Sequence, residues 1–293
     1  MENNTTQRSV IAIIIVLVIA AGVAWAGSQG GVQAFGIPLF ALCVAVAFII
    51  QWVVFIHAYV NQTEAFFDLT GSITYITVVL MAVFLSPSAD ARAWLLLVMV
   101  AIWAIRLGTF LFMRIRAAGE DRRFRELKTS FPRFLVTWTL QGLWVTFSLA
   151  AALAAITSEI KVELGIYALV GTIVWVVGFG IEVIADRQKN VFRNDPQNEG
   201  KFIQSGLWSW SRHPNYFGEI VLWIGVAIIA LPVLRGWQWV TLISPIFIII
   251  LLTRISGVPM LEARADEKWG GQDDYEAYKA RTSVLILRPP AEG

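Results

Sequence analysis

The chain has 293 residues, of which 57% are hydrophobic and only 15% are charged. Soluble globular proteins carry about 25% charged residues, so this composition excludes an ordinary soluble domain and predicts a polytopic membrane protein. The net charge of +2 is too small to indicate a nucleic-acid partner.

Eight segments are long enough, or nearly so, to cross a bilayer, which takes about 17–25 apolar residues in a helix. They are residues 9–26, 36–60, 70–86, 93–113, 133–156, 164–185, 217–233 and 236–253. This pattern predicts an all-α fold, a transmembrane bundle of about eight helices in a single integral membrane domain over residues 1–293. We expect the first segment to be an uncleaved signal-anchor that could lie at the edge of the bundle.

Basic residues divide the connecting segments into two sets. Most of the 23 Lys and Arg residues fall in segments 114–133, 187–212 and 254–288. With eight crossings, these three segments lie on the same side of the membrane as both termini. The positive-inside rule makes that side cytoplasmic, so we expect cytoplasmic termini.

One segment on that side, residues 61–69, has no Lys or Arg but contains Glu64 and Asp68. Acidic residues contribute little to topology, so this segment could be an ordinary short acidic loop. Alternatively, both acids face the same cavity as the basic loops. Asp68 and Tyr75 are about two turns apart on one face of the next helix. Asp68 could equally be the N-cap of that helix, with Tyr75 in the packing.

Several cations lie beside carboxylates or deep in a helix. Arg106 is well inside the fourth segment, where an unpaired charge is costly, so either a structural carboxylate partner or a ligand is expected. Arg122 lies in an arginine-rich loop that could simply attract the headgroups of anionic membrane lipids. Lys189 follows Asp186 at the end of the sixth segment, and there we favour ligand binding. Because Arg and Lys bind phosphate, a ligand with several phosphates fits this set.

The polar residues between Gly206 and Glu219 stand directly before an apolar run. They are Arg212, His213, Asn215, Tyr216 and Glu219. Polar groups at a bilayer entrance indicate a functional site by default. Interfacial anchoring is the alternative, but it does not call for Asn, His and Glu together. Two histidines and one cysteine without ligand spacing indicate no metal site, and the glycine motifs of Rossmann and P-loop folds are absent.

The run Ser211-Arg-His-Pro-Asn-Tyr-Phe-Gly-Glu219 resembles the signature of bacterial membrane proteins related to steroid 5-alpha-reductases. That superfamily includes the sterol reductases and, more distantly, the isoprenylcysteine carboxyl methyltransferases. The similarity continues upstream in Glu182-x-x-x-Asp186-x-Gln188. Downstream it includes Gly257-x-Pro259-x-Leu261-Glu262 and Tyr275-x-x-Tyr278.

The resemblance implies an NADPH-dependent oxidoreductase of the bacterial inner membrane. Such an enzyme reduces a carbon–carbon double bond in a lipophilic enone, steroid-like or isoprenoid-like, that enters from the bilayer. The residues expected to hold NADPH are Arg106, Arg122, Asp186, Lys189, Arg212, His213, Asn215, Tyr216, Glu219, Glu262, Arg264 and Tyr278, with the tail 254–293 closing over the site. By role, an acid (Asp68 or Glu64) and the phenol of Tyr75 would polarise the substrate carbonyl.

Two other functions stay open. Arg212-His213-Pro214-x-Tyr216-x-Gly218 is also similar to the carboxyl methyltransferase signature, which implies S-adenosylmethionine in place of NADPH. A lipid-binding membrane protein that kept the fold without the chemistry is the third class. The tail lacks the His-x-x-Trp-Tyr pattern expected of animal steroid reductases, so the steroid substrate is less well supported than the cofactor.

Overall fold

A computed structural model describes residues 2–121 and 124–290 and shows an almost entirely helical protein. In this part of the chain, eight helices are long and apolar enough to span a membrane. They are Asn4–Ser28, Leu39–Val60, Phe67–Leu85, Ala91–Arg116, Phe131–Ile156, Ile166–Asn194, Pro214–Val233 and Gly236–Trp269. The predicted class and number of helices are confirmed, and every predicted segment overlaps one of these spans.

The chain divides into two compact units, each described here by itself. The first unit comprises Met1–Gly165 and Ile229–Ser244, and the second comprises Ile166–Ile228 and Pro245–Gly293. The basic and aromatic residues of the 206–219 signature and of the tail belong to the second unit. The early acids and Tyr75 belong to the first.

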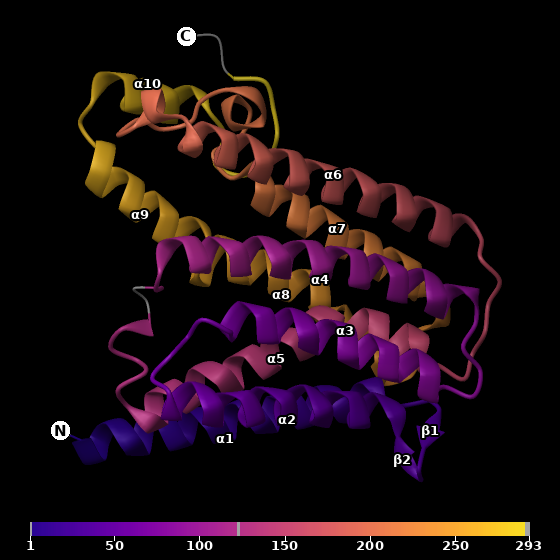
Figure 1. The fold of residues 1–293 in the computed structure, drawn as a ribbon. Helices are drawn as coiled ribbons and strands as arrows, with labels where there is room; N and C mark the ends of the chain where they lie inside the picture. Colours follow the sequence, from indigo (N-terminus) through magenta and orange to yellow (C-terminus); the bar gives the residue numbers. More distant parts are fainter. Residues whose placement is uncertain (1, 122–123, 291–293) are drawn as a thin grey trace. The chain divides into compact units, whose positions relative to one another are not determined.

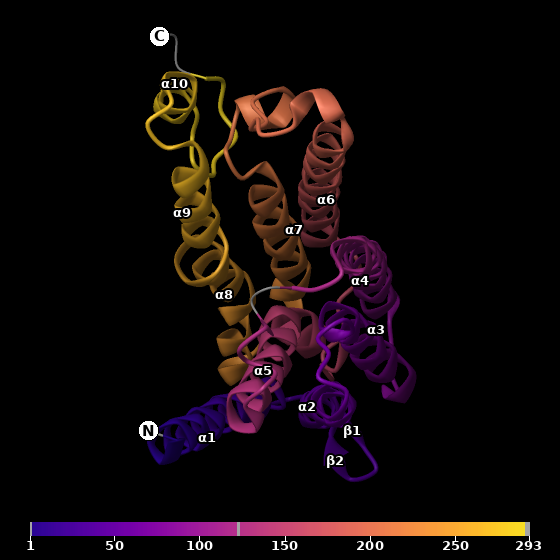
Figure 2. The same cartoon turned by 60° about the vertical axis from the view of Figure 1, so that its left-hand side comes forward.

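The first unit is built around α5 (Phe131–Ile156), the most buried of the eight helices. Four helices and one 3-10 segment pack against α5 (Figure 2). They are α1 (Glu2–Gly27), α2 (Leu39–Val60), α3 (Phe67–Leu85), α4 (Ala91–Ala118) and η5 (Gly236–Leu242). The packing face of α5 ends in a run of Ala and Leu from Leu149 to Ile156, whose small side chains allow close approach of neighbouring helices.

A short antiparallel hairpin joins α1 to α2 (Figure 1). Its strands are β1 (Gln33–Ala34) and β2 (Ile37–Pro38), joined by Phe35 and Gly36, whose φ angles are 57° and 75°. Two positive φ values in succession are those of a type I′ turn, the turn that matches the twist of a hairpin. We did not predict this hairpin, because two-residue strands leave no periodic signal in the sequence.

Arg92 is fully buried at the start of α4, within the first unit. Its Nη1 donates to the carbonyl of Ile229 at 2.6 Å, and its Nη2 donates to the carbonyls of Val162 and Glu163 at 3.0 and 3.2 Å. Carbonyls that end a helix or form a turn lack backbone partners. The guanidinium therefore satisfies three carbonyls from two distant segments and ties them to α4.

The second unit begins with α6 (Ile166–Asn194) and includes the first part of α7 (Pro214–Ala230), which run side by side in both views (Figures 1 and 2). Between them lie the short 3-10 turns η2 (Pro196–Asn198) and η3 (Gly206–Ser209). Glycines lie along the line of contact between α6 and α7, which we call the glycine seam. A Cβ on Gly218 would lie 2.6 Å from the carbonyl oxygen of Gly178. The two backbones touch, which only glycine permits.

The last span is interrupted before it reaches the tail. The helix α8 (Ile243–Ile250) passes into the π-helical turn η6 (Leu251–Ile255) and then, after Gly257, into α9 (Val258–Trp269). A turn at Gly270 and Gly271 leads to α10 (Asp273–Arg281). The sequence pattern predicts short amphipathic helices over 261–268 and 275–281, on either side of a glycine turn. Both are helical in the structure, and the first begins earlier because Pro259 suits an opening helical turn.

The glycine seam gives a stability test. Gly218→Ala places a methyl group 2.6 Å from the backbone nitrogen of Glu182 as well as against Gly178, and neither backbone atom can rotate away. We expect a loss of about 1–3 kcal/mol, as for other overpacked sites, and a lower melting temperature in detergent.

Gly180→Ala on α6 is the matched control, because among the described residues no atom outside its own helix backbone lies within 4 Å of its Cβ position. There alanine should leave stability unchanged or raise it, since Ala is a better helix former than Gly by about 1 kcal/mol. Equal melting temperatures for Gly218→Ala and the parent protein would show that the contact between α6 and α7 accommodates a methyl group at this position.

Candidate cofactor site

The signature loop before α7 is braced by the end of the chain. The backbone N–H of Arg212 donates to the carbonyl of Ser283 at 2.8 Å, and Ser211 forms a parallel bridge with Ser283. The Ser211 hydroxyl donates to the carbonyl of Leu285 at 2.8 Å. Backbone pairing of this kind fixes the direction in which the loop's side chains project.

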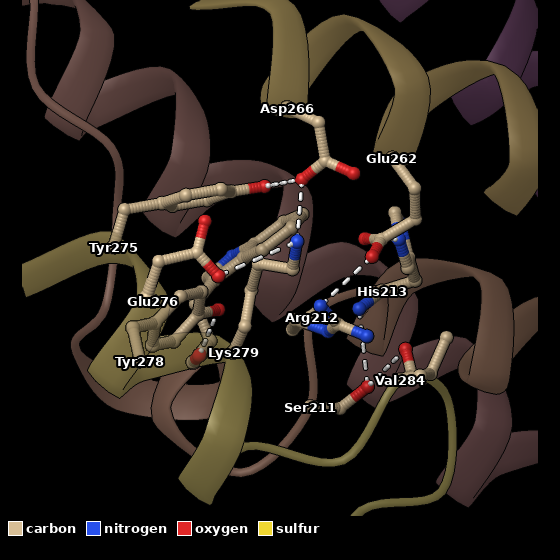
Figure 3. A network of polar contacts seen from close by, with 11 residues as sticks. Ser211, Arg212, His213, Glu262, Asp266, Tyr275, Glu276, Tyr278, Lys279 and Val284 are labelled. Atoms are coloured by element: carbon tan, nitrogen blue, oxygen red, sulfur yellow. Dashed lines mark hydrogen bonds and ion pairs between the residues drawn. The ribbon is translucent and has the colours of Figure 1, made fainter. Parts of the chain in front are cut away.

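Glu262 is the centre of the site. From α9 its carboxylate reaches the signature loop, with Oε1 at 2.7 Å from His213 Nε2 and Oε2 at 2.8 Å from Arg212 Nη1 (Figure 3). The contact with His213 is a hydrogen bond; that with Arg212 is an ion pair at short range without hydrogen-bond alignment. The carboxylate thereby joins α9 to the loop that precedes α7, using one oxygen for each partner.

His213 is held in a defined protonation state. Its pKa is lowered because burial disfavours the imidazolium more than the hydrogen bond and charge of Glu262 favour it. The ring is therefore neutral at pH 7, and since a carboxylate can only accept, Nε2 carries the proton. The lone pair of Nδ1 is buried and has no hydrogen-bond partner among the described residues. It can accept a hydrogen bond from a ligand.

Further signature residues support this loop from behind. Tyr216 stacks on His213 with ring centroids 5.7 Å apart and planes 10° apart. Asn215 donates to Asp186 on α6 at 3.1 Å, while its own carbonyl oxygen is buried without a partner in the part of the chain that the structure describes. Together with Nε of Arg212, which is likewise buried and unpaired there, the loop presents unsatisfied polar atoms of both kinds. Buried polar atoms without partners are rare and point to a missing ligand or water.

A second set of contacts attaches α10. Asp266 on α9 accepts from the phenol of Tyr275 at 3.1 Å and from Lys279 at 2.7 Å (Figure 3). The phenol of Tyr278 donates to the carbonyl of Trp208 at 2.7 Å, and burial raises the pKa of that phenol, which keeps it a donor. The loop, α9 and α10 therefore surround one space.

That space is a pocket of about 340 Å³ within the second unit. Basic and aromatic side chains dominate its lining. The basic ones are Lys189, Arg193, Lys201, Arg212, Arg264 and Lys268, and the aromatic ones are Phe192, Phe202, Trp208, Trp269, Tyr275 and Tyr278. Among the lining residues, Glu262 is the one carboxylate. Such a lining suits an anionic ligand that also has flat rings.

The structure places the predicted cofactor residues in three groups. Six line the pocket: Lys189, Arg212, His213, Glu262, Arg264 and Tyr278. Asp186, Asn215 and Tyr216 form the layer behind the signature loop, and Glu219 is half-buried on α7. Arg106 belongs to the first unit, where its guanidinium lies 5.5 Å from the ring centroid of Phe110, and Arg122 lies outside the described residues.

The early acids have different surroundings within the first unit. Glu64 is buried; its Oε2 pairs with Lys128 at 2.8 Å and its Oε1 accepts from the backbone N–H of Asp121 at 2.9 Å. Asp68 lies in the first turn of α3, whose N-cap is Phe66, so it is not the N-cap that we considered. Tyr75 is buried on the same helix, edge-on to Trp103 at 5.1 Å.

Sequence reasoning missed most of the aromatic lining. Trp208, which would lie at the membrane surface if the signature residues were interfacial anchors, is buried, donates to the carbonyl of Ala185 at 3.0 Å and has Lys189 over its ring at 4.2 Å. Phe202 and Trp269 were not singled out. Their spacing to basic neighbours, Lys201-Phe202 and Lys268-Trp269, is a cation–aromatic alternation that could have marked them.

The central carboxylate gives a prediction. Glu262→Gln replaces one acceptor oxygen by an NH2 group, which faces a donor, so the site should lose about 1–3 kcal/mol of folding free energy. Glu267→Gln, exposed on the same helix, is the control and should melt with the parent. Thermal unfolding in detergent measures both, and identical curves for the two variants would mean that Glu262 does not hold α9 to the loop.

Three relatives among characterised proteins are similar over part of the chain. The rat (Rattus norvegicus) 3-oxo-5-alpha-steroid 4-dehydrogenase 1 is 27% identical over 165 residues, 53% of this chain and 56% of the rat protein. The Delta(14)-sterol reductase of Arabidopsis thaliana is 29% identical over 97 residues, 29% of this chain and 23% of that protein. The probable O-methyltransferase ustE of Ustilaginoidea virens is 36% identical over 62 residues, 21% of this chain and 22% of that protein.

The chain thus spans about half the length of the rat protein and less than a quarter of the other two. No solved structure matches it. The predicted resemblance to steroid and sterol reductases is confirmed by the first two relatives. A family model described as "Protein of unknown function (DUF1295)" matches residues 54–282, most of the chain, and the protein belongs to that family.

Proposed function

We propose that this protein is an integral membrane reductase that uses NADPH to reduce a carbon–carbon double bond in a lipophilic enone, steroid-like or isoprenoid-like. The observation that carries the proposal is the pocket of the second unit, in which six cations and six aromatic side chains surround one carboxylate. The similarity to a steroid and a sterol reductase supports the reaction class. When bound, NADPH would supply the hydride.

The residues present fit such a cofactor. The diphosphate and 2′-phosphate need basic partners, and Lys189, Arg193 and Arg264 stand along the pocket wall. A carboxamide on a flat ring needs both a hydrogen-bond acceptor and donors. The buried Nδ1 of His213 and the unpaired Nε of Arg212 are such groups. In this arrangement Glu262 holds the two side chains in place and would fix how the ring is presented.

Calorimetry with detergent-extracted protein tests the cofactor. NADPH should bind tightly, and NADH more weakly because it lacks the 2′-phosphate that the basic wall would hold. Arg264→Ala, which removes an exposed cation of that wall, should weaken NADPH binding by about tenfold, in line with the loss of one charge-assisted contact. Glu267→Ala, on the same helix outside the pocket, should leave binding unchanged.

The same titration separates the proposal from its main competitor. The short similarity to a probable O-methyltransferase favours S-adenosylmethionine as the second candidate. S-adenosylmethionine carries a positive sulfonium and no phosphate, which suits a pocket lined by six cations poorly. Tight binding of S-adenosylmethionine with no binding of NADPH would overturn the reductase proposal.

The residues proposed to polarise the substrate carbonyl are Asp68 and Tyr75, about two turns apart on α3. Hydrogen bonds to that oxygen would stabilise the negative charge that develops there as the double bond is reduced. We no longer assign Glu64 to this role, because both its oxygens already accept hydrogen bonds, from Lys128 and from the backbone of Asp121. A carboxylate held as an acceptor cannot also serve as the donor.

Single-turnover NADPH oxidation with an enone steroid tests this assignment. Asp68→Ala and Tyr75→Phe should each slow the reaction by about 100-fold, the usual loss for one donor at an oxyanion site, and leave NADPH binding unchanged. Glu64→Gln should lower thermal stability and keep the rate of the folded protein. Parent rates for both Asp68→Ala and Tyr75→Phe would mean that other residues hold the carbonyl.

We also propose that both termini and the cofactor pocket face the cytoplasm of a bacterial inner membrane. The support is the concentration of Lys and Arg in segments 114–133, 187–212 and 254–288. Reporter fusions at Gly27, the last residue of α1, and at Ser88, Ser158 and Gly236, which follow α3, α5 and α7, should report the outside. An inside signal at Ser158 would contradict this orientation.

A further inference from the structure

A second pocket adjoins the first in the same unit. It measures about 240 Å³ and is lined by Phe192, Gly200, Lys201, Phe202, Gln204, Ser205, Trp269, Gln272 and Asp274. Four residues line both pockets: Phe192, Lys201, Phe202 and Trp269. Because the same side chains form a wall of each, the two pockets are neighbouring parts of one groove. Ligand sites span about 300–1,000 Å³, so the smaller pocket is below this range and the larger is near its lower end, and a dinucleotide would need both.

The chemistry of the two pockets differs. The larger one contains the signature residues, Glu262 and most of the cations. The smaller one combines aromatic rings with neutral or acidic hydrogen-bonding groups: the amides of Gln204 and Gln272 and the carboxylate of Asp274. Lys201, on the shared wall, is its one cation among the lining residues. A pocket with rings, amides and a carboxylate suits a flat heterocycle that carries an amino group and ring nitrogens.

Contacts with neighbouring residues fix the aromatic side chains of the shared wall, Phe202 and Trp269. The ring of Phe202 contacts Trp269, Tyr275 and Tyr278 at centroid distances of 5.8, 5.2 and 5.4 Å. Trp269 is further fixed by a hydrogen bond from its Nε1 to the carbonyl of Gly200 at 2.6 Å. Because these rings are already fixed, a base can stack on them without the entropy cost of ordering the side chains on binding.

We propose that the smaller pocket is the adenine subsite of the cofactor groove, with Phe202 and Trp269 as its aromatic wall and Asp274 as the acceptor for the exocyclic amino group. The inference rests on the proposed function and assigns the two halves of the cofactor to the two pockets. The nicotinamide half occupies the pocket of His213 and Glu262. Lys201 stands at the junction, where the phosphates pass from one pocket to the other.

Fragments of the cofactor test the division. The probes are NADPH, 2′,5′-ADP as the adenosine half, and reduced nicotinamide mononucleotide as the other half, each titrated by microscale thermophoresis in detergent. Phe202→Leu and Asp274→Ala should weaken NADPH and 2′,5′-ADP by about tenfold, within the range for loss of one base-stacking ring. Asp274→Ala should bind reduced nicotinamide mononucleotide as the parent does, because Asp274 lines the smaller pocket and not the larger one.

Asp273→Ala is the matched control. Asp273 is the neighbouring acid in the first turn of α10; it is also exposed and lines neither pocket. It should bind all three probes normally, which separates loss of a contact from loss of the helix's N-terminal charge. If NADPH binds the parent but Phe202→Leu and Asp274→Ala retain parent affinity for 2′,5′-ADP, the adenine lies elsewhere and this inference is overturned. If the parent binds no NADPH at all, the proposed function fails with it.

Discussion

The second unit depends on one half-buried carboxylate, that of Glu262, which has a cationic and a polar partner. Glu262 comes from a helix near the end of the chain, and Arg212 and His213 come from a loop about fifty residues earlier. Without the carboxylate, a guanidinium would be buried unpaired, which is costly in free energy. With it, the imidazole has a fixed tautomer, the guanidinium has a fixed direction, and α9 is attached to the start of α7.

Further contacts restrict the motion of the signature loop that holds the partners of this carboxylate. Tyr216 supports the imidazole from one face, the Asp186–Asn215 bond fixes the first turn of α7 on α6, and the segment 283–285 braces the loop backbone. The glycine seam of α6 and α7 makes that support possible, because backbone contact leaves little freedom between the two helices. A polar cluster built on rigid helices can hold a ligand in a defined orientation.

In the first unit, charged side chains that are buried in a largely apolar bundle need polar partners. Arg92 satisfies carbonyls at the ends of segments, and Glu64 satisfies a lysine and a backbone amide from the segment after α4. The contacts of Arg92 hold distant segments to α4, and those of Glu64 hold the segment before α3 to the segment after α4. Charged side chains therefore join parts of the chain in this unit, and in the other unit they form part of a candidate ligand pocket.

The sequence by itself was enough to predict the class of fold, the eight membrane spans and the two tail helices, because each depends on local hydrophobic periodicity and length. The residues of the signature were also found in advance, since polar side chains beside an apolar run stand out in any sequence. Local pattern could not show that Glu64 pairs with Lys128, that Trp208 is buried beneath Lys189, or that Phe202 and Trp269 share a wall. Each of these contacts joins residues far apart in the chain, and their meeting is decided by how the helices and the tail pack, which only the tertiary structure determines.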